Sequence, residues 1–410
     1  MNLLALDPAL PQRDLLLDET LMSEYLSRLL VRYQGSATQD CARLRTKYRV
    51  GTSLRVLYEV SGDTRSYRVA ARAFPRTHRV ANQFTSSISI NAPELNTVFW
   101  VFPHDRKLKN LSVLDEIPGE LRNITGRTWT RSRIVAHAPE KSVTAQCLDD
   151  DDQIIAYAKI YAGDEGQQIF DTYTHVAQSL QTQHDAQIPR PIAYFEKHHL
   201  LLLEPAGGLS LSAVGTTKHE RAFFRLGRAL KTLHCIEAPS STPRSTRLTP
   251  DALTHGTTII SQARPDIADM VHSVSAALIK QYQPGIAVFL HGDVHPKNIL
   301  LDDERLFLLD LDQAATGLPE VDLGSVIAGL YCDACTGLRT WREASALKRN
   351  LLDGYGAPQS SHTLRWHVAA ALLNERALRS VTRVRVGSLE RLPEILLAAK
   401  SVLNGGISEN

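Results

Sequence analysis

The spacing of hydrophobic positions changes several times along the chain, and each spacing predicts a different element. Residues 14–33 carry apolar side chains every three or four positions, which predicts one amphipathic helix with Asp14 as its N-cap. Residues 54–60 and 66–74 alternate between apolar and polar on either side of the turn at 61–63, which predicts a β-hairpin. The chain is therefore expected to open with a helix and a small sheet.

A second hairpin pattern occupies residues 142–148 and 154–161. In it, Ala158-Lys-Ile-Tyr161 stands 87 residues after Ala71-Arg-Ala-Phe74 of the first hairpin. We interpret the recurrence as a degenerate duplication of a small β-module, and a coincidence between two ordinary hairpins is the alternative. The intervening residues 96–115 predict a strand, a turn and a short helix.

Two short apolar runs farther along the chain each end in a carboxylate. Residues 286–290 precede Asp293, residues 306–309 precede Asp310, and Asn298 lies between the two carboxylates. Phosphoryl transfer from a nucleotide needs such a set: one carboxylate orients and deprotonates an acceptor hydroxyl, while an amide and a second carboxylate hold Mg²⁺ against the phosphates.

The stretch HGDVHPKN followed by LLDLDQAATGLPEVDLG resembles the catalytic core of the aminoglycoside phosphotransferase/choline kinase superfamily. Leu311 replaces the usual aromatic residue and Leu318 replaces the usual aspartate, and neither position is a metal ligand in that family. The resemblance implies an α+β, bilobal protein-kinase-like fold with a small β-rich N-lobe and a mainly helical C-lobe.

The resemblance also divides the chain into three parts. We expect an extra N-terminal α/β accessory module over residues 1–125, which holds the first copy of the hairpin. The kinase-like N-lobe is expected over residues 126–205. The helical C-lobe, with the catalytic loop and the acceptor-binding helices, is expected over residues 206–410.

Lys159 lies inside an apolar strand, where a lysine is costly unless it faces solvent or has a partner. The resemblance implies that it is the kinase lysine that contacts the nucleotide phosphates, and a solvent-facing lysine is the alternative. Glu165 and Asp171 of the following helix are candidate acidic partners, although either can simply favour the dipole of the helix N-terminus.

The resemblance places the adenine-binding hinge after the apolar run at residues 200–203. Pro205 has no N–H group, so the expected donor is Ala206 and the expected acceptor is the carbonyl group of Glu204. Residues 136–141 stand where a hairpin should cover the phosphates, but they contain no glycine.

The family motif implies a role for each residue of the catalytic stretch. Asp293 is the expected base, and Asn298 and Asp310 are the expected Mg²⁺ ligands. His291 is expected to brace the loop, and His295 to support it or to contact substrate.

Two further aspartates complete the motif. Asp312 is expected to lie behind the metal ligands or to act as a further ligand. Asp322 resembles the structural aspartate that ties the C-lobe together in the family.

Composition limits the classes of partner. The chain has 46 basic and 44 acidic residues, a net charge of +2, which gives no basis for bulk attraction to nucleic acid or membrane. Its five scattered cysteines and an N-terminus without a signal-peptide pattern favour a cytoplasmic location. The expected partners are a nucleotide and a small molecule, and the sequence does not indicate an oligomeric state.

The charge of residues 331–410 bears on the acceptor. This segment contains eleven basic and seven acidic residues, whereas a site for a polycationic aminoglycoside should be rich in carboxylates. We therefore expect a neutral or anionic hydroxyl compound, such as a sugar or a sugar derivative, within a class that also includes amino sugars and antibiotics. Asn374, Glu375 and Arg376 form the expected acceptor-binding cluster.

These observations predict a Mg²⁺-dependent kinase that transfers the γ-phosphoryl group of ATP, or of GTP, to a hydroxyl group of a small molecule. One alternative is a catalytically silent kinase-like binding or scaffold protein. Another is a protein kinase, but the segment at residues 311–321 is too short for a peptide-docking activation segment.

Overall fold

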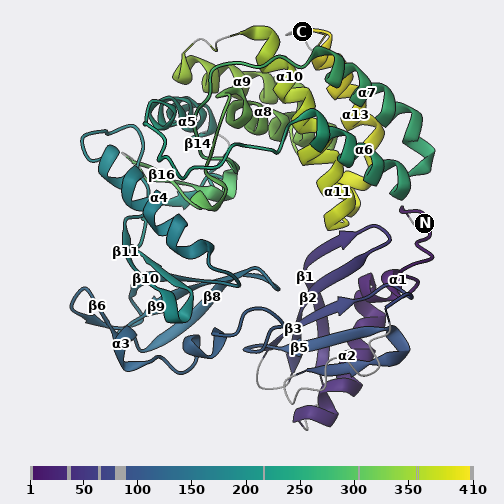
Figure 1. Cartoon of the computed structure of the whole chain (residues 1–410), viewed down its shortest axis with the longest axis vertical. Helices are drawn as coiled ribbons and strands as arrows, with labels where there is room; N and C mark the ends of the chain where they lie inside the picture. Colours follow the sequence, from purple (N-terminus) through teal and green to yellow (C-terminus); the bar gives the residue numbers. More distant parts are fainter. Residues whose placement is uncertain are drawn as a thin grey trace.

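The computed structural model describes residues 3–34, 38–62, 66–78, 89–215, 218–302, 305–356, 358 and 360–406. Figure 1 shows three parts arranged in a ring: an N-terminal part with one sheet, a second part with another sheet, and a helical C-terminal part. The fold is of the α+β class, with antiparallel sheets in the first half and mainly helices in the second.

The N-terminal part begins with two helices where the hydrophobic pattern predicts one. α1 (Arg13–Leu17) and α2 (Glu19–Gln34) are separated by Asp18, whose backbone is extended. The Asp18 carboxylate accepts a hydrogen bond from the Leu21 N–H and so caps α2. The predicted N-cap was wrong, because Asp14 lies within α1.

The two helices pack on a five-stranded antiparallel sheet with the strand order β1-β2-β3-β5-β4. The predicted first hairpin is confirmed as the β2–β3 pair, although part of its turn lies outside the described residues. The strands are β1 (Thr38–Arg49), β2 (Ser53–Gly62), β3 (Ser66–Ala73), β4 (Ile90–Ala92, followed by the 3₁₀ turn η1, Pro93–Leu95) and β5 (Thr97–Val101).

The two faces of this sheet differ in polarity. The face beneath the helices is buried and apolar, and it includes Tyr58, whose hydroxyl donates to the Leu16 carbonyl. The opposite face carries cationic side chains, because Lys47 of β1 pairs in register with Arg55 of β2, which in turn pairs with Arg72 of β3. One face therefore builds a core, and the other presents positive charge.

The second sheet has the strand order β11-β12-β10-β9-β8 and is also antiparallel throughout. It follows a short connecting region that contains η2 (Leu111–Leu114), α3 (Gly119–Arg122), β6 (Asn123–Ile124) and β7 (Arg127–Thr128). Its elements are β8 (Arg131–Ala138), β9 (Ser142–Leu148), β10 (Ile154–Tyr161), α4 (Glu165–Ser179), β11 (Pro191–Phe195), η3 (Glu196–His198) and β12 (Leu200–Leu203).

The two sheets share one topology. Numbered from its own first strand, each sheet has the order first, second, third, fifth, fourth. Arg72 on the third strand of the first sheet corresponds to Lys159 on the third strand of the second, as the sequence recurrence places them. The shared topology supports the proposal that the accessory module and the N-lobe arose by duplication.

The C-terminal part is built from helices around a few short strands. The strands are β13 (Leu209–Ser210), β14 (Val288–Leu290), β15 (Ile299–Leu301), β16 (Leu306–Leu308) and β17 (Ala315–Gly317). The helical elements are α5 (His219–His234), α6 (Pro250–Ala263), η5 (Pro265–Ile267), α7 (Ala268–Gln281), η6 (Pro296–Asn298), η7 (Leu311–Gln313), α8 (Glu320–Cys335), α9 (Trp341–Tyr355), α10 (Ser361–Ala371), the π-helical η8 (Leu372–Ala377), α11 (Leu378–Arg383), α12 (Val386–Glu390) and α13 (Leu392–Leu403).

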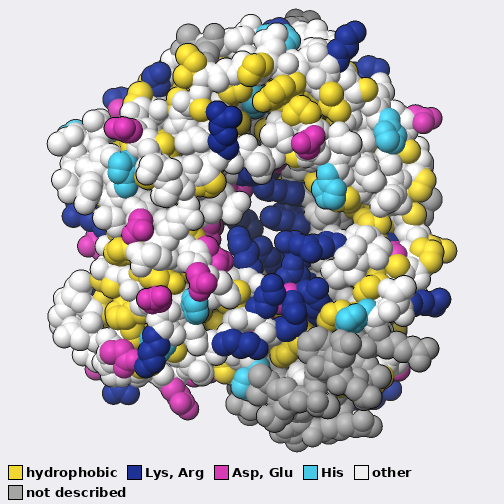
Figure 2. All heavy atoms as spheres, in the orientation of Figure 1, with side chains coloured by type: hydrophobic (Ala, Val, Ile, Leu, Met, Phe, Trp, Pro, Cys, Tyr) yellow, Lys and Arg dark blue, Asp and Glu magenta, His cyan; other side chains and the backbone are white. Residues whose placement is uncertain are grey.

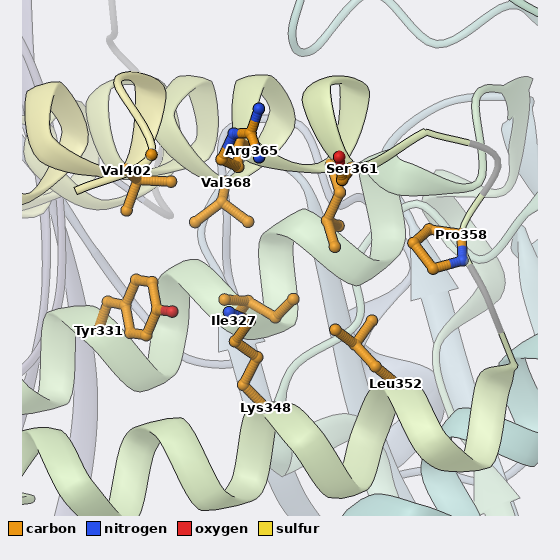
Figure 3. Close-up of a pocket in the computed structure, with 11 residues that line it drawn as sticks. Ile327, Tyr331, Lys348, Leu352, Pro358, Ser361, Arg365, Val368 and Val402 are labelled. Carbon is orange, nitrogen blue, oxygen red and sulfur yellow. The ribbon is translucent and has the colours of Figure 1, made fainter. Parts of the chain in front are cut away.

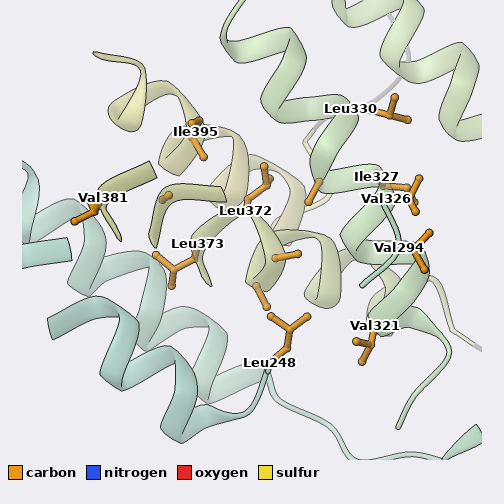
Figure 4. Close-up of a cluster of buried hydrophobic side chains, with 14 of the residues drawn as sticks. Leu248, Val294, Val321, Val326, Ile327, Leu330, Leu372, Leu373, Val381 and Ile395 are labelled. Carbon is orange, nitrogen blue, oxygen red and sulfur yellow. The ribbon is translucent and has the colours of Figure 1, made fainter. Parts of the chain in front are cut away.

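An apolar core fixes the catalytic stretch against these helices. Figure 4 shows Val294, the residue after Asp293, within the same cluster as side chains of α8 and η8. Val294 is 1% exposed. Its burial anchors the loop while its polar neighbours remain accessible.

The N-terminal part closes the ring through contacts with both other parts. The Ala5 N–H donates to the carbonyl of Ala263 at the end of α6 (2.9 Å), and β1 packs against α11. On the other side, the Glu140 carboxylate between β8 and β9 contacts Arg55 and Arg72 of the first sheet at 3.2 and 2.5 Å. The N-terminal part thus contacts both the second part and the C-terminal part.

Candidate active site

His291, Gly292 and Asp293 follow β14, which pairs with β17. Gly292 has a φ of +80°, and a Cβ at this position would lie 1.8 Å from the carbonyl oxygen of Gln313. Only glycine fits here. The turn at Gly292 places Asp293 at the end of the strand, as the sequence predicts for this carboxylate.

The Asp293 carboxylate lies between cationic side chains. Arg247 Nη2 and Arg379 Nη2 are each 3.4 Å from its Oδ1, and His295 Nε2 is 3.8 Å from its Oδ2. Burial would raise the pKa of Asp293, but the charges of Arg379 and Arg247 lower it below its usual value. Asp293 is therefore ionised at neutral pH, and its side chain is 24% exposed, so a ligand can reach it.

His295 faces the same carboxylate from the loop itself. Its ring is partly exposed. Burial lowers the pKa of His295 even though the charge of Asp293 opposes this effect. Neutral His295 can thus donate or accept a hydrogen bond near the proposed base.

A buried network ties the loop to the surrounding helices. Asp322, in the first turn of α8, accepts hydrogen bonds from the backbone N–H groups of His291 (2.8 Å) and Gly292 (3.0 Å) and from His234 Nε2 of α5 (3.2 Å). His291 Nε2 donates to the carbonyl of Leu309 (2.9 Å), beyond β16. These contacts join both halves of the catalytic stretch.

Asn298 and Asp310 are brought together by main-chain hydrogen bonding. The Leu309 N–H donates to the Asn298 carbonyl (2.8 Å), and Asn298 Nδ2 donates to the Asp293 carbonyl (3.1 Å). The amide of Asn298 therefore keeps its oxygen for a ligand. Amide and carboxylate oxygens are ligands that Mg²⁺ prefers, so these two residues fit a Mg²⁺ site.

Asp310 has a left-handed backbone with a φ of +67°. Its N–H and that of Leu311 both donate to the hydroxyl of Tyr173 in α4, at 3.1 and 3.2 Å. Tyr173 is buried. The N-lobe helix thus holds the backbone that presents the carboxylate of Asp310.

Lys159 reaches across the two lobes to the catalytic stretch. Its Nζ lies 2.8 Å from Asp310 Oδ1 and 2.8 Å from Asp312 Oδ1. Burial alone would lower the pKa of Lys159, but the two carboxylates raise it. The solvent-facing alternative for Lys159 was wrong, since its side chain is 12% exposed.

The two expected acidic partners of Lys159 were also wrong. Asp171 Oδ1 accepts a hydrogen bond from Gln167 Nε2 within α4, and among the described ion pairs Glu165 has none with Lys159. The physical reason is that Asp310 and Asp312 occupy the position next to the ammonium group.

Asp312 contacts the same Lys159 ammonium group as Asp310 but is more deeply buried. Tyr161 of β10 donates its hydroxyl to Asp312 Oδ1 (3.0 Å), and the Asp312 side chain is 6% exposed. Burial raises the pKa of Asp312, and the neighbouring charge of Asp310 adds to the effect. For Asp310, Lys159 outweighs burial and lowers the pKa. The pKa values of the two carboxylates are thus shifted in opposite directions.

The predicted hinge lies between β12 and β13. The Glu204 N–H donates to the Arg190 carbonyl (2.8 Å). Within the described residues, the Ala206 N–H and the Glu204 carbonyl make no main-chain hydrogen bond. Gly208 has a φ of +110°, and a Cβ there would meet the backbone at Leu301 (2.5 Å). A glycine is needed where the linker crosses the C-lobe.

The hairpin expected over the phosphates is the β8–β9 pair, and its tip contains Glu140. The Glu140 side chain is 4% exposed and also contacts Arg106 at 2.9 Å. Together with its contacts to the accessory module, this ion pair fixes the tip in place without a glycine-rich sequence.

The expected acceptor-binding cluster lies in η8, a π-helical turn of the kind often found at functional sites. Asn374 Nδ2 donates to the Arg247 carbonyl (2.8 Å), and Glu375 contacts the Arg247 guanidinium group (2.5 Å). Arg376 donates to the Ser325 carbonyl. Glu375 is buried, and the Arg247 guanidinium group that it contacts is also 3.4 Å from Asp293 Oδ1.

Three residues near Asp293 and Asp310 were not predicted from the sequence. Tyr173 resembles any core residue of an amphipathic helix, and Arg247 lies in a loop that resembles ordinary surface. Arg379 belongs to the basic excess of the C-terminal segment, which is the signal that points to it.

Pockets lie beside the catalytic loop and also away from it. One of about 180 Å³ adjoins Arg247, Glu375 and Arg379. Another, of about 270 Å³ and shown in Figure 3, lies among α8, α9, α10 and α13 and contains none of the predicted site residues.

The described residues contain no group of three or more His, Cys, Asp or Glu side chains arranged to hold a metal ion. No helix among them combines the length and the apolar character needed to cross a bilayer.

Solved structures with a similar fold include several phosphotransferases. A thermostable mutant of aminoglycoside phosphotransferase APH(4)-Ia, in ternary complex with ADP and hygromycin B, has a TM-score of 0.50 and 13% identity over 73% of this chain and 100% of that one. A choline/ethanolamine kinase family protein from Mesorhizobium loti has a TM-score of 0.48 and 14% identity over 71% and 92%. At 13% identity, the likeness to the first of these structures shows the fold alone.

Macrolide 2'-phosphotransferase MphH from Brachybacterium faecium has a TM-score of 0.45 and 17% identity over 73% of this chain and 99% of that chain. No curated protein matches the sequence significantly. Residues 156–366, more than half of the chain, match the family described as the phosphotransferase enzyme family, APH. The match spans Lys159 and the whole catalytic stretch, and the chain therefore belongs to this phosphotransferase family.

Proposed function

We propose that this phosphotransferase moves the γ-phosphoryl group of ATP to a hydroxyl group of a small molecule, a sugar or a related compound. The observation that carries the proposal is the convergence of Lys159 from the N-lobe with Asp310 and Asp312, 2.8 Å away in each case, beside the loop that presents Asp293. Catalysis of this reaction depends on positioning and electrostatics, which such a constellation supplies.

Each residue has a role that follows from its surroundings. Ionised Asp293 orients the acceptor hydroxyl and accepts its proton as the new P–O bond forms and the bond to the β,γ-bridging oxygen breaks. Lys159 donates to the nucleotide phosphates. Glu204 and Ala206 present the free backbone groups of the hinge to the base.

Asn298 and Asp310 would hold Mg²⁺, which when bound neutralises charge on the β- and γ-phosphate oxygens. His291 and Asp322 hold the loop that carries Asp293 through their buried hydrogen bonds. Asp312 holds the ammonium group of Lys159 in position through its ion pair. GTP is a second candidate donor, because the hinge recognises the base through backbone groups alone.

The two other functions have less support. A silent scaffold has no need to retain Lys159, Asp293, Asn298 and Asp310 in this arrangement. A protein kinase needs a peptide-docking segment, whereas β17 pairs with β14 directly after η7 and leads into α8.

The test is ADP release by the full chain with Mg²⁺, ATP or GTP, and a panel of sugars, amino sugars, antibiotics and choline. Asp293→Ala should lower kcat/KM for the accepted compound by about 10²–10⁴-fold, the usual contribution of a positioned base, while nucleotide binding persists. Asp269→Asn, an exposed aspartate of α7, is the matched control.

Near-normal turnover of Asp293→Ala would contradict the proposal. Absence of Mg²⁺-dependent nucleotide binding by the unaltered chain would favour the scaffold instead.

A further inference from the structure

Basic side chains from all three parts of the chain converge beside the proposed active site. Figure 2 shows Lys and Arg side chains gathered in the central hollow of this face. They come from β1 and β2, from the tip of the β8–β9 hairpin, and from the loops and helices of the C-lobe: Arg45, Lys47, Arg55, Lys141, Arg247, Arg379 and Arg383. We call this set the basic cleft.

The basic cleft reaches from the accessory module to the reacting groups. Arg45, Lys47 and Lys141 line one pocket between β1, β2 and the hairpin tip. β1, which carries Arg45 and Lys47, packs against α11, which carries Arg379 and Arg383. Arg379 Nη2 lies 3.4 Å from Asp293 Oδ1, so the cations extend from the accessory module to Asp293.

Much of this positive charge has no protein counter-ion. The nearby carboxylates are engaged elsewhere: Glu140 with Arg55, Glu375 with Arg247, and Asp310 with Lys159. In the part of the chain that the structure describes, no ion pair involves the side chains of Arg45, Lys47, Lys141 or Arg383.

The cations around Lys47 lie close enough to affect its pKa. Burial and the like charges of Arg55, Arg49, Lys141 and Arg45 lower the pKa of Lys47 to about 8. Such a one-signed cleft focuses its field on an incoming anion.

We propose that the acceptor carries a phosphate group, and that Arg45, Lys47 and Arg383 hold this group while the acceptor hydroxyl faces Asp293. The inference deepens the proposed function and rests on it, since it names the chemical class of acceptor for the same site. It assigns the accessory module a direct part in binding, because Arg45 and Lys47 belong to β1.

A small phosphate ester suits the cleft better than a nucleic acid. The unpaired cations are concentrated at the site, while the whole chain has a net charge of only +2. A polyanion needs a longer basic track. The same cations would attract an acceptor with a dianionic phosphate group and repel a cationic aminoglycoside.

The test compares sugars with their phosphate esters in both calorimetric binding and ADP release: glucose, glucosamine, glucose 6-phosphate and ribose 5-phosphate. We expect the phosphate esters to bind at least tenfold more tightly than the parent sugars. Added salt should weaken the binding of the phosphate esters more than that of the parent sugars. Lys47→Gln and Arg383→Gln should each lower the preference for phosphate esters about tenfold or more.

Arg28→Gln, which removes an exposed arginine from α2 of the same module, is the matched control and should leave the preference unchanged. Arg383→Lys keeps the charge and should retain part of the preference. Circular dichroism on each variant separates loss of binding from loss of folding.

Equal or tighter binding of the neutral or amino sugars would overturn the inference, as would an unchanged preference in both Gln variants. A short RNA that binds more tightly than every phosphate ester would overturn it in favour of nucleic acid. Asp293-dependent transfer to a neutral acceptor would leave the proposed function standing while this inference fails. Binding of phosphate esters without any phosphoryl transfer would support the phosphate site but contradict the proposed function.

Discussion

Asp310 holds a backbone conformation that residues other than glycine rarely adopt, and Tyr173 stabilises it. Left-handed backbone at such a residue costs about 1–3 kcal/mol and persists only where the surroundings enforce it. The Tyr173 hydroxyl accepts hydrogen bonds from two consecutive N–H groups, those of Asp310 and Leu311. One hydroxyl group of the N-lobe thus sets the geometry of a proposed metal ligand in the C-lobe.

Tyr173→Phe should lower the free energy of unfolding by about 1–3 kcal/mol, because two buried N–H groups lose their acceptor. It should also lower kcat, since Asp310 loses its enforced geometry. Urea denaturation and ADP release measure the two effects. Tyr282→Phe, at a partly exposed ring, should change neither, and equal behaviour of the two variants would refute the role of Tyr173.

The sequence made some of these residues predictable and left others hidden. Asp293 and Asp310 each follow an apolar run, so their places in the fold follow from the pattern. Tyr173 and Arg247 act through contacts between segments distant in sequence, and no local spacing encodes such contacts. Lys159 was identified, but its partners were not, because they lie 151 and 153 residues away.

At the scale of elements, the first turn of α8 works as an anchor for the catalytic loop. Asp322 is 1% exposed and accepts hydrogen bonds from three donors. Burial would raise the pKa of Asp322, but the hydrogen bond and charge of His234 lower it. The ionised carboxylate is therefore more stable in the folded chain than in the unfolded one.

Asp322→Asn should lower the free energy of unfolding by about 3–5 kcal/mol at pH 7, the cost of breaking a buried pair. Because the folded-state pKa is depressed, this stabilisation is complete above the unfolded value of about 4 and is lost as the pH falls through the folded value. Urea denaturation of both proteins between pH 7 and pH 3 should show the difference shrinking in acid. If the difference in the free energy of unfolding did not depend on pH, the loss would come from altered hydrogen bonding or packing and not from the charge of Asp322.

The strands show where element prediction succeeds. β2, β3, β9 and β10 alternate clearly and were expected. β1 was not, because basic residues occupy its outer face and a β-bulge interrupts its register between Arg43 and Arg45. The shared order of the two sheets became visible only in the structure, since their sequences keep little beyond the Arg72 and Lys159 correspondence.

At the scale of the whole molecule, Glu140 is the point at which the accessory module holds the N-lobe. Its buried carboxylate contacts three arginines of the module, Arg55 and Arg72 in the first sheet and Arg106 after it. Removal of the carboxylate leaves three like charges close together without a partner.

Glu140→Gln should therefore lower the free energy of unfolding by about 3–5 kcal/mol and speed hydrogen exchange in the β8–β9 hairpin. Denaturation and exchange mass spectrometry measure these changes. Glu59→Gln, which breaks an exposed pair with Arg68 (3.8 Å), should cost at most about 1 kcal/mol. Similar costs for the two variants would show that Glu140 does not fasten the module.

The closed ring has a mechanical consequence. A kinase-like protein with a single linker can swing its lobes about one hinge. Here the lobes are joined by the linker at residues 204–208 and also through the accessory module. The module contacts the N-lobe through Glu140 and the C-lobe through Ala5 and β1. Movement of one lobe against the other would therefore also have to change the contacts of the accessory module, so we expect displacement of the module to alter the spacing between Lys159 and Asp310.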